Sequence, residues 1–248
     1  MLLPDKVAII TGASRGIGKS IAKTLAENGA SLTIVGTNRD LLNDVSCDVK
    51  KLGRECLIYA GDVTKPETAE AVAEKTIGYF GRIDILVNNA GINMRSSTLD
   101  MDLQDWHRVI DVNLNGNLYF SKAVLSHMVE KRCGKIVNVS STTAKSGHKN
   151  AAPSYGASKA GVDYLTRHLA LEMAKHNINV NGVSPGPVET DMIKQWSEEY
   201  FQKVVSNVPL QRLGTPQNVA DAVLFLASNM ADFITGEIIN VNGGTYIN

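Results

Sequence analysis

The sequence has 248 residues, of which 44% are hydrophobic, and its 25 basic residues balance its 25 acidic ones. This apolar fraction suffices for the core of one large α/β domain or two small ones, whereas the balanced charge excludes nucleic acid and anionic membrane surfaces as main partners. No apolar run approaches the roughly 20 residues that cross a bilayer, no leader pattern opens the chain, and the three cysteines lack metal-binding or redox spacing. We therefore expect a globular cytoplasmic protein with reduced thiols.

The first element is a short β-branched run at residues 6–11 (KVAIIT), which predicts a strand covered on both faces. A glycine-rich turn follows, and apolar positions at helical spacing then predict a helix from Gly16 to Asn28. Strand-like and helix-like segments go on alternating along the chain. We expect further strands at 32–35, 56–59, 83–87, 135–139, 178–183 and 237–241, and helices near 41–52, 68–80, 114–129, 155–175 and 219–227.

This alternation predicts an α/β fold, because parallel strands need crossover connections and helices supply them. No linker-like segment interrupts residues 1–248, so we expect a single domain with a doubly wound (Rossmann) seven-stranded parallel sheet and helices on both faces. Residues 189–213 break the rhythm and hold Trp196, Tyr200 and Phe201 at helical spacing. They predict a small lobe over the carboxyl ends of the strands, where ligands of such sheets bind.

The turn after the first strand reads TGASRGIG at residues 11–18. Glycines at this place permit a tight turn and let a pyrophosphate approach the backbone at a helix N-terminus, where free amides favour anions. The spacing of Gly12, Gly16 and Gly18 differs from the general G-x-G-x-x-G fingerprint, and a glycine turn that serves packing alone is the alternative. The turn indicates a dinucleotide site.

The segment YGASK places Tyr155 and Lys159 four positions apart, on one face of the predicted helix. An ammonium group beside a phenol favours the ionised phenol, so the pair can exchange a proton near neutral pH. The same spacing is also typical of an ordinary solvated pair.

These features occur together with NNAG at 88–91, Asn113, the pair Ser140 and Ser141, and the dipeptide at 185–186. The set, in this order, resembles the short-chain dehydrogenase/reductase family, and the resemblance covers essentially the whole chain. It implies a catalytic site built into the nucleotide-binding domain, in agreement with the predicted fold.

The resemblance implies four catalytic residues. Tyr155 would be the general acid in ketone reduction, and Lys159 would hold the nicotinamide ribose and lower the pKa of the tyrosine. Ser141 would hydrogen-bond the substrate oxygen, and Asn113 would anchor a water that links Lys159 to solvent. Because adjacent side chains on a strand point to opposite faces, only one of Ser140 and Ser141 can reach the tyrosine, and alignment with the family selects Ser141.

The end of the second predicted strand carries no acid within residues 35–39 that would bind a free ribose 2′-hydroxyl. Arg15 and Arg39 supply positive charge and Thr37 a hydroxyl for a 2′-phosphate, so NADP(H) is the expected cofactor, with two solvated surface arginines as the alternative. The family resemblance implies cofactor contacts from Gly12, Ser14, Arg15, Gly16, Ile17, Gly18, Thr37, Asn38, Arg39, Asp62, Val63, Asn89, Ala90, Gly91, Tyr155, Lys159, Pro185, Gly186, Val188 and Thr190.

Within the family, the chain length, Thr37 and the segments PGPVETDM and ITGEIINVNGGTYIN are most similar to the bacterial 3-oxoacyl-[acyl carrier protein] reductases. We therefore expect NADP(H)-dependent reduction of a ketone to a secondary alcohol, with a small-molecule or acyl-carrier-linked substrate and a homotetrameric assembly. A generic carbonyl, sugar or hydroxysteroid reductase is the alternative. A non-catalytic NADP-binding sensor or scaffold is disfavoured by the intact catalytic set.

An acidic acyl carrier protein would need basic residues beside the active-site entrance. Arg132 stands where the carrier-protein reductases have one docking arginine, whereas His176, next to Lys175, takes the place of the other. His148 and Lys149, in the loop before Tyr155, are further candidates for substrate contact, although a solvated loop residue is the simpler interpretation of His148.

Overall fold

The strand-forming runs assemble into one parallel sheet in the order β3-β2-β1-β4-β5-β6-β7. The computed structural model describes residues 1–147, 151–190 and 197–247. The strands are β1 (Val7–Thr11), β2 (Ser31–Gly36), β3 (Cys56–Ala60), β4 (Ile85–Asn88), β5 (Gly134–Val139), β6 (Ile178–Pro185) and β7 (Ile238–Val241). The α-helices are α1 (Gly16–Glu27), α2 (Arg39–Lys51), α3 (Pro66–Phe80), α4 (Leu103–Ile110), α5 (Gly116–Lys131), α6 (Pro153–Met173), α7 (Glu198–Ser206) and α8 (Pro216–Ala227).

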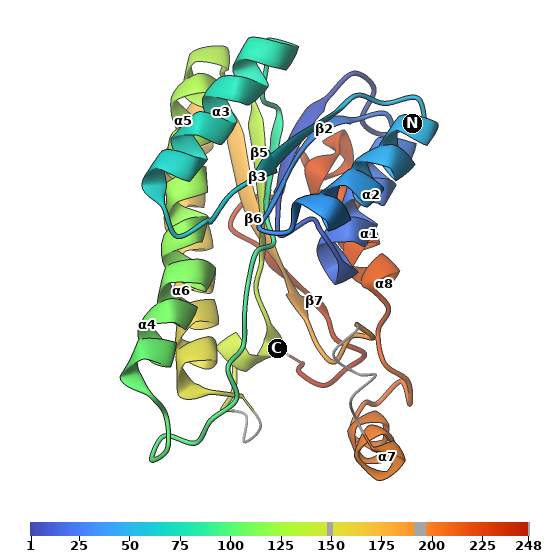
Figure 1. Ribbon diagram of the computed structural model, residues 1–248, viewed down its shortest axis with the longest axis vertical. Helices are drawn as coiled ribbons and strands as arrows, with labels where there is room; N and C mark the ends of the chain where they lie inside the picture. Colours follow the sequence, from blue (N-terminus) through green and yellow to red (C-terminus); the bar gives the residue numbers. More distant parts are fainter. Residues whose placement is uncertain (148–150, 191–196, 248) are drawn as a thin grey trace.

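The sheet is covered on both faces, because its continuous apolar strands leave no face for water. Figure 1 shows α1, α2 and α8 on one side and α3, α4, α5 and α6 on the other. The buried residues form two matching clusters. One is centred on Ile21, Leu32 and Val223, and the other on Leu86, Phe120 and Val180. The predicted doubly wound sheet with helices on both faces is confirmed.

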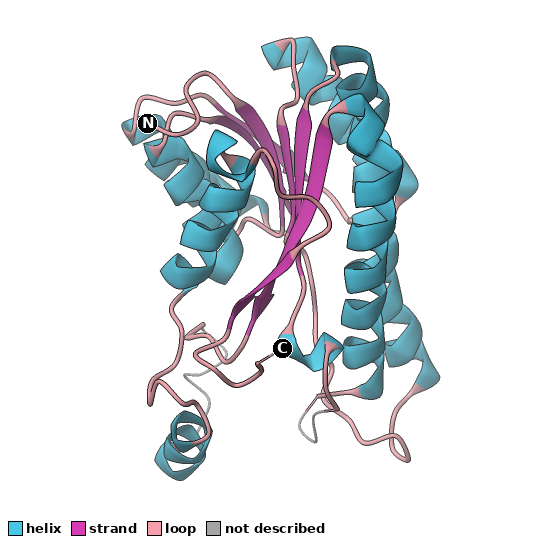
Figure 2. Ribbon diagram, turned by 180° about the vertical axis from the view of Figure 1, so that it is seen from behind, coloured by secondary structure: helices cyan, strands magenta, loops and turns pink. Residues whose placement is uncertain are grey.

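Two helices lie outside the predicted alternation. The helix α4 has only eight residues and buries only Val109, and it continues into a π-helical turn, η1 (Asp111–Asn115), before α5 begins. The helix α7 buries no residue and projects from the body below the sheet (Figures 1 and 2). It holds Tyr200 and Phe201 of the expected lobe, whereas Trp196 lies outside the described residues.

The strand order reverses between β1 and β4, where the connections lead to opposite faces of the sheet. Such a switch point opens a crevice at the carboxyl ends of the strands, and ligands of doubly wound sheets bind there. The loops after β1 and β4 carry the glycine turn and the NNAG segment. The topology therefore brings these two motifs together. Among the described residues, no helix is both long and apolar enough to cross a membrane.

Candidate active site

The glycine turn after β1 is shaped by close contacts that exclude side chains. Gly12 has a φ of +65°, and a Cβ there would lie 2.8 Å from the Cα of Ala90. A Cβ on Gly18 would overlap the carbonyl oxygen of Gly12. The turn thus forms a cradle of bare backbone at the N-terminus of α1, and this shape fits the pyrophosphate of a dinucleotide.

Hydrogen bonds join this turn to the loop after β4. The backbone N–H groups of Asn89 and Ala90 donate to the Thr11 hydroxyl over 3.0 and 3.1 Å. In return, the Asn89 side-chain amide donates to the carbonyl oxygens of Thr11 and Gly12, each over 3.0 Å. Both amide hydrogens of Asn89 are therefore used to fix the turn, so a cofactor contact from this residue must use its other polar atoms.

The end of β2 lies against the same turn. Ala13 donates its backbone N–H to the Val35 carbonyl oxygen over 3.1 Å, and a Cβ on Gly36 would lie 3.6 Å from the Cβ of Ser14. Thr37, Asn38 and Arg39 follow and are exposed. The Asn38 side chain accepts a hydrogen bond from the Leu41 backbone over 3.0 Å and so caps α2, a local role that competes with cofactor binding.

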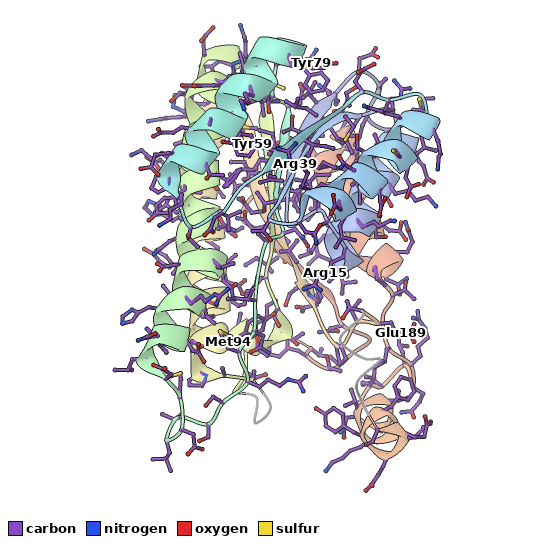
Figure 3. The ribbon with its side chains drawn as sticks, in the orientation of Figure 1. Arg15, Arg39, Tyr59, Tyr79, Met94 and Glu189 are labelled. Atoms are coloured by element: carbon purple, nitrogen blue, oxygen red, sulfur yellow. The ribbon has the colours of Figure 1, made fainter. Side chains whose placement is uncertain are left out.

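Arg15 and Arg39 are both exposed, and neither forms an ion pair with an acid of the described residues. Figure 3 shows Arg15 at the carboxyl end of the sheet, between Met94 and Glu189, and Arg39 at the start of α2. Two unpaired guanidinium groups on the loops after β1 and β2 can receive a phosphate.

The loop after β3 adjoins the end of β2, because the Gly61 N–H donates to the Gly36 carbonyl oxygen over 2.9 Å. Asp62 is exposed and accepts a hydrogen bond from the Thr64 backbone over 2.9 Å, whereas Val63 is buried. Both residues therefore lie at the same edge of the sheet as the glycine turn.

Tyr155 and Lys159 stand one helical turn apart at the start of α6. The Lys159 Nζ lies 5.9 Å from the centroid of the Tyr155 ring and donates a hydrogen bond to the Val139 carbonyl oxygen over 2.7 Å. Lys159 is only 4% exposed. The carbonyl at the end of β5 therefore holds the ammonium beneath the ring.

Burial changes the proton affinity of both groups. It lowers the pKa of Lys159 from 10.5 to about 8, against the opposing effect of the Asp163 carboxylate. Burial raises the pKa of Tyr155 above its ordinary value, and a hydrogen bond from Ser141 partly opposes this rise. The net shift of the phenol pKa is therefore upward, opposite to the direction expected from an adjacent ammonium group, because the loss of solvation is the largest effect.

The two adjacent serines after β5 point in different directions, as expected for extended backbone. Ser141 lies on the side of Tyr155, where its hydroxyl opposes the rise in the pKa of the phenol. The Ser140 hydroxyl instead donates to the Lys159 carbonyl oxygen over 3.4 Å and lies on the side of Asp163, whose pKa it helps to lower. The structure therefore places Ser141, the serine selected from the sequence, beside the tyrosine.

Asn113 lies in the π-helical turn η1 and is 1% exposed. Its amide oxygen accepts from the Ile92 N–H over 2.8 Å, and its amide group donates to the Ile92 carbonyl oxygen and to the Ser158 hydroxyl, each over 3.0 Å. A Cβ on Gly91 would lie 3.3 Å from the Asn113 Oδ1 and 3.4 Å from the Lys159 Nζ. Asn113 is thus close to Lys159, but both amide hydrogens of Asn113 are donated to protein acceptors. The expected water would therefore have to bind the Asn113 backbone or the remaining lone pair of its amide oxygen.

The segment after β6 crosses the mouth of the same crevice. A Cβ on Gly186 would lie 2.9 Å from Asn242, while Val188 forms a parallel bridge with Gly214. The methyl group of Thr190 would lie 3.7 Å from a Cβ on Gly16. Thr190 therefore approaches the glycine turn, and Pro185, Gly186 and Val188 precede it on the same segment. Asp191 and Met192 of the PGPVETDM segment lie outside the described residues, as do His148 and Lys149.

The basic residues proposed for carrier-protein docking lie elsewhere. The Arg132 guanidinium donates to the Lys175 carbonyl oxygen over 3.1 Å, so these two residues and the adjacent His176 form one patch at the far end of α6. With a rise of about 1.5 Å per residue, the 21 residues of α6 separate this patch from Tyr155 by about 30 Å. The expectation that Arg132 stands beside the entrance is therefore wrong within one chain.

Two residues of the site were missed in the sequence. The Thr143 side chain donates to Ser141 over 2.9 Å, and Asp163 is a buried carboxylate one turn beyond Lys159. Asp163 has a sequence signal, since a charged residue at this spacing shares the helix face of Tyr155 and Lys159. Thr143 has none, because its contact depends on a short 3₁₀ turn, η2 (Thr142–Ala144).

Comparison with known proteins gives matches over nearly the whole chain. The family model described as enoyl-(acyl carrier protein) reductase matches residues 12–246. The chain is 43% identical over 247 residues to the 3-oxoacyl-[acyl-carrier-protein] reductase FabG of Vibrio cholerae and 40% identical to that of Escherichia coli, with 100% of each chain covered.

Solved structures give the same result for the fold. A 3-oxoacyl-[acyl-carrier protein] reductase from Brucella melitensis superposes with a TM-score of 0.95 at 34% identity, covering 100% of this chain and 93% of the other. A short-chain type dehydrogenase/reductase from Mycobacterium marinum superposes with a TM-score of 0.94 at 34% identity, covering 99% of this chain and 97% of the other.

Proposed function

This chain belongs to the short-chain dehydrogenase/reductase family of nicotinamide-dependent oxidoreductases, and on that premise we propose that it reduces the 3-oxo group of an acyl chain carried by acyl carrier protein, with NADPH as the hydride donor. The observation that carries the proposal is the arrangement of Ser141, Tyr155 and Lys159 beside the backbone cradle of the glycine turn. A proton donor and a hydrogen-bond donor then stand next to the site of a hydride donor.

The chemistry of the reduction divides between cofactor and protein. When bound, the nicotinamide supplies a hydride to the carbonyl carbon. The Tyr155 phenol gives its proton to the carbonyl oxygen, and its raised pKa keeps it protonated until that oxygen becomes basic. The Ser141 hydroxyl donates to the same oxygen as negative charge grows there, which stabilises the transition state more than the ground state.

Lys159 assists this proton transfer from its position beside the Tyr155 ring. Its pKa of about 8 leaves it mostly protonated at neutral pH, so it can hold a ribose hydroxyl and stabilise the phenolate that remains after proton transfer. The same pKa lets Lys159 pass its proton toward the phenolate at little cost and take another from the solvent path, so that the phenol is reprotonated. Asn113, close to Lys159 through Gly91, lies where a water on that path would be held.

NADPH is favoured over NADH by charge. Arg15 and Arg39 are exposed and unpaired with acids of the described residues, and Thr37 stands between them in the sequence. Replacing both arginines by alanine should lower kcat/KM with NADPH by at least tenfold and leave kcat/KM with NADH within about twofold. Equal efficiency of the wild-type protein with both cofactors would contradict the proposed selection.

The substrate is the finer part of the proposal. Relatives at 40 to 43% identity bear the name 3-oxoacyl-[acyl-carrier-protein] reductase, whereas the family description names an enoyl reductase. A proton donor and a second hydrogen-bond donor beside one another suit an oxygen that gains charge, so they favour the carbonyl. His176 in place of a second arginine favours the generic carbonyl, sugar or hydroxysteroid reductase as the second candidate.

An acyl carrier protein has to reach the site through basic groups. Since the patch of Arg132, Lys175 and His176 lies about 30 Å from Tyr155 in its own chain, it serves docking only if a second copy brings it to the entrance. We therefore include a homotetramer in the proposal, with exposed Tyr164 and Leu171 of α6 among the residues available for contact between copies. A cytoplasmic location agrees with the exposed free thiols of Cys47 and Cys133.

The test is NADPH oxidation by the purified protein with a 3-oxoacyl thioester, beside a panel of plain ketones, diketones and keto sugars. We expect at least tenfold higher kcat/KM for the thioester. Arg132→Glu should then raise KM for the carrier-linked substrate and leave KM for a small thioester unchanged. Turnover of free carbonyls alone would support the generic reductase, while no turnover of any carbonyl would contradict the proposed reaction.

A further inference from the structure

One residue of the 3₁₀ turn η2, which directly follows Ser141, donates two hydrogen bonds to the serine hydroxyl. The backbone N–H of Thr143 donates to the Ser141 Oγ over 3.2 Å, and the Thr143 hydroxyl donates to the same atom over 2.9 Å. Ser141 is 8% exposed, so little solvent competes for these contacts.

A serine hydroxyl has two acceptor lone pairs and one proton to donate. With both lone pairs occupied by Thr143, the Ser141 oxygen can take no further donor, and its proton is left to point elsewhere. Tyr155 lies on that side, since the Ser141 hydroxyl opposes the rise in the pKa of its phenol. The hydroxyl is thus fixed in one of the orientations that a free serine would sample.

This orientation of the Ser141 hydroxyl matters for carbonyl reduction, because negative charge develops on the substrate carbonyl oxygen to which Ser141 donates. A hydroxyl that accepts from another hydroxyl is polarised and becomes a stronger donor. We propose that Thr143 is a positioning residue that commits the Ser141 hydroxyl to donate toward Tyr155 and the substrate oxygen. The inference rests on the proposed function for its effect on turnover, but its geometry is independent of the substrate.

The turn that carries Thr143 is itself held at both sides. Lys145 donates to the Asn240 side chain over 2.6 Å and lies 5.4 Å from the centroid of the Tyr246 ring, which ties the turn to the edge strand β7 and the C-terminal segment. On the other side, a Cβ on Gly156 would lie 3.5 Å from the Thr143 carbonyl oxygen. The turn therefore packs against the first turn of α6 and cannot rotate freely.

The test compares Thr143→Val with Thr142→Val. Both changes remove a hydroxyl at nearly constant volume from half-buried neighbours, but the Thr142 hydroxyl makes no hydrogen bond to any described residue. We expect Thr143→Val to lower kcat by about tenfold with an unchanged nicotinamide dissociation constant, because one acceptor site is left open. Thr142→Val should retain wild-type kcat, and Thr143→Ser, which keeps the hydroxyl, should recover kcat to within about twofold.

A double-mutant cycle separates positioning from packing. In a Ser141→Ala background, Thr143→Val should cause no further loss, because it acts through the serine hydroxyl. A loss as large as in the wild-type background, or wild-type kcat in Thr143→Val alone, would overturn the inference.

A second readout needs no substrate. The Tyr155 phenol can be titrated by ultraviolet difference absorbance against Tyr155→Phe. We expect its pKa to shift upward in Thr143→Val, since a less constrained Ser141 donates less to the phenolate. The charged groups on the two elements that carry the site, Lys159 and Asp163 on α6 and Lys145 after the turn, are the same in both proteins. An unshifted pKa would contradict the inference even if no carbonyl proves to be a substrate.

Discussion

The burial of Lys159 predicts a specific dependence of stability on pH. The lysine is 4% exposed, and burial lowers its pKa from 10.5 to about 8 in the folded state. The unfolded chain keeps the ordinary value, so between about pH 8 and pH 10.5 the unfolded state binds more protons than the folded state. The free energy of unfolding contributed by this group must therefore rise as pH rises through that window.

The magnitude follows from the two pKa values. Their difference, at about 1.4 kcal/mol per pH unit, corresponds to about 3.5 kcal/mol, of which about 2.5 kcal/mol is recovered between about pH 7 and pH 10. Lys159→Met cannot titrate and so lacks this term. Its other costs, such as the unpaired Val139 carbonyl oxygen, do not change with pH.

Urea unfolding of the wild-type and Lys159→Met proteins without cofactor, at about pH 7 and pH 10, isolates the effect. We expect the stability of the wild type relative to the variant to increase by about 2.5 kcal/mol between the two pH values. Titration of Tyr155, whose pKa is raised, occurs in both proteins and largely cancels. A difference that stays constant with pH would refute the account of a desolvated ammonium.

Three further changes test other parts of the structure. Gly18→Ala should abolish nicotinamide dinucleotide binding in a fluorescence titration, because its Cβ overlaps backbone, whereas Gly78→Ala, with open space around it, should bind normally. Thr11→Val leaves two backbone amides without their acceptor and should lower the free energy of unfolding by about 2 kcal/mol, so an unchanged urea midpoint would count against the joined loops. Burial raises the pKa of Asp163, so the ionised carboxylate destabilises the folded wild type as pH rises above the unfolded pKa near 4. The melting temperature of Asp163→Asn relative to wild type should therefore rise from about pH 4 to pH 8. A difference in melting temperature that does not change with pH would contradict this cost of ionisation.

The order of the strands and helices could be predicted from the sequence because it depends on local patterns. Continuous apolar runs such as those of β1 and β6 indicate buried parallel strands, and each is followed or preceded by helical periodicity. Where the pattern depends on distant partners, prediction fails. The fourth strand begins at Ile85 and not at Ile83, and the Asp84 carboxylate before it accepts a hydrogen bond from the Val7 backbone, 77 positions away in the chain.

The location of the site was predictable, but the use of its polar atoms was not. Glycines and the tyrosine and lysine pair have fixed spacings, so their positions at the switch point follow from topology. Asn89 and Asn113 instead donate their amide hydrogens to backbone carbonyl oxygens and to the Ser158 hydroxyl. These donors and acceptors come together only in the folded chain. The pKa of Tyr155 was predicted with the wrong sign because burial cannot be read from spacing.

The most direct test of the central claim is the rate of 3-oxoacyl thioester reduction by Tyr155→Phe beside wild type, with nicotinamide binding measured for both. Phenylalanine preserves the ring and its packing against Lys159 but removes the proton donor. The account predicts that kcat falls by about 10² to 10⁴ while the nicotinamide dissociation constant stays within about twofold. Reduction at the wild-type rate would contradict the role of Tyr155 as general acid.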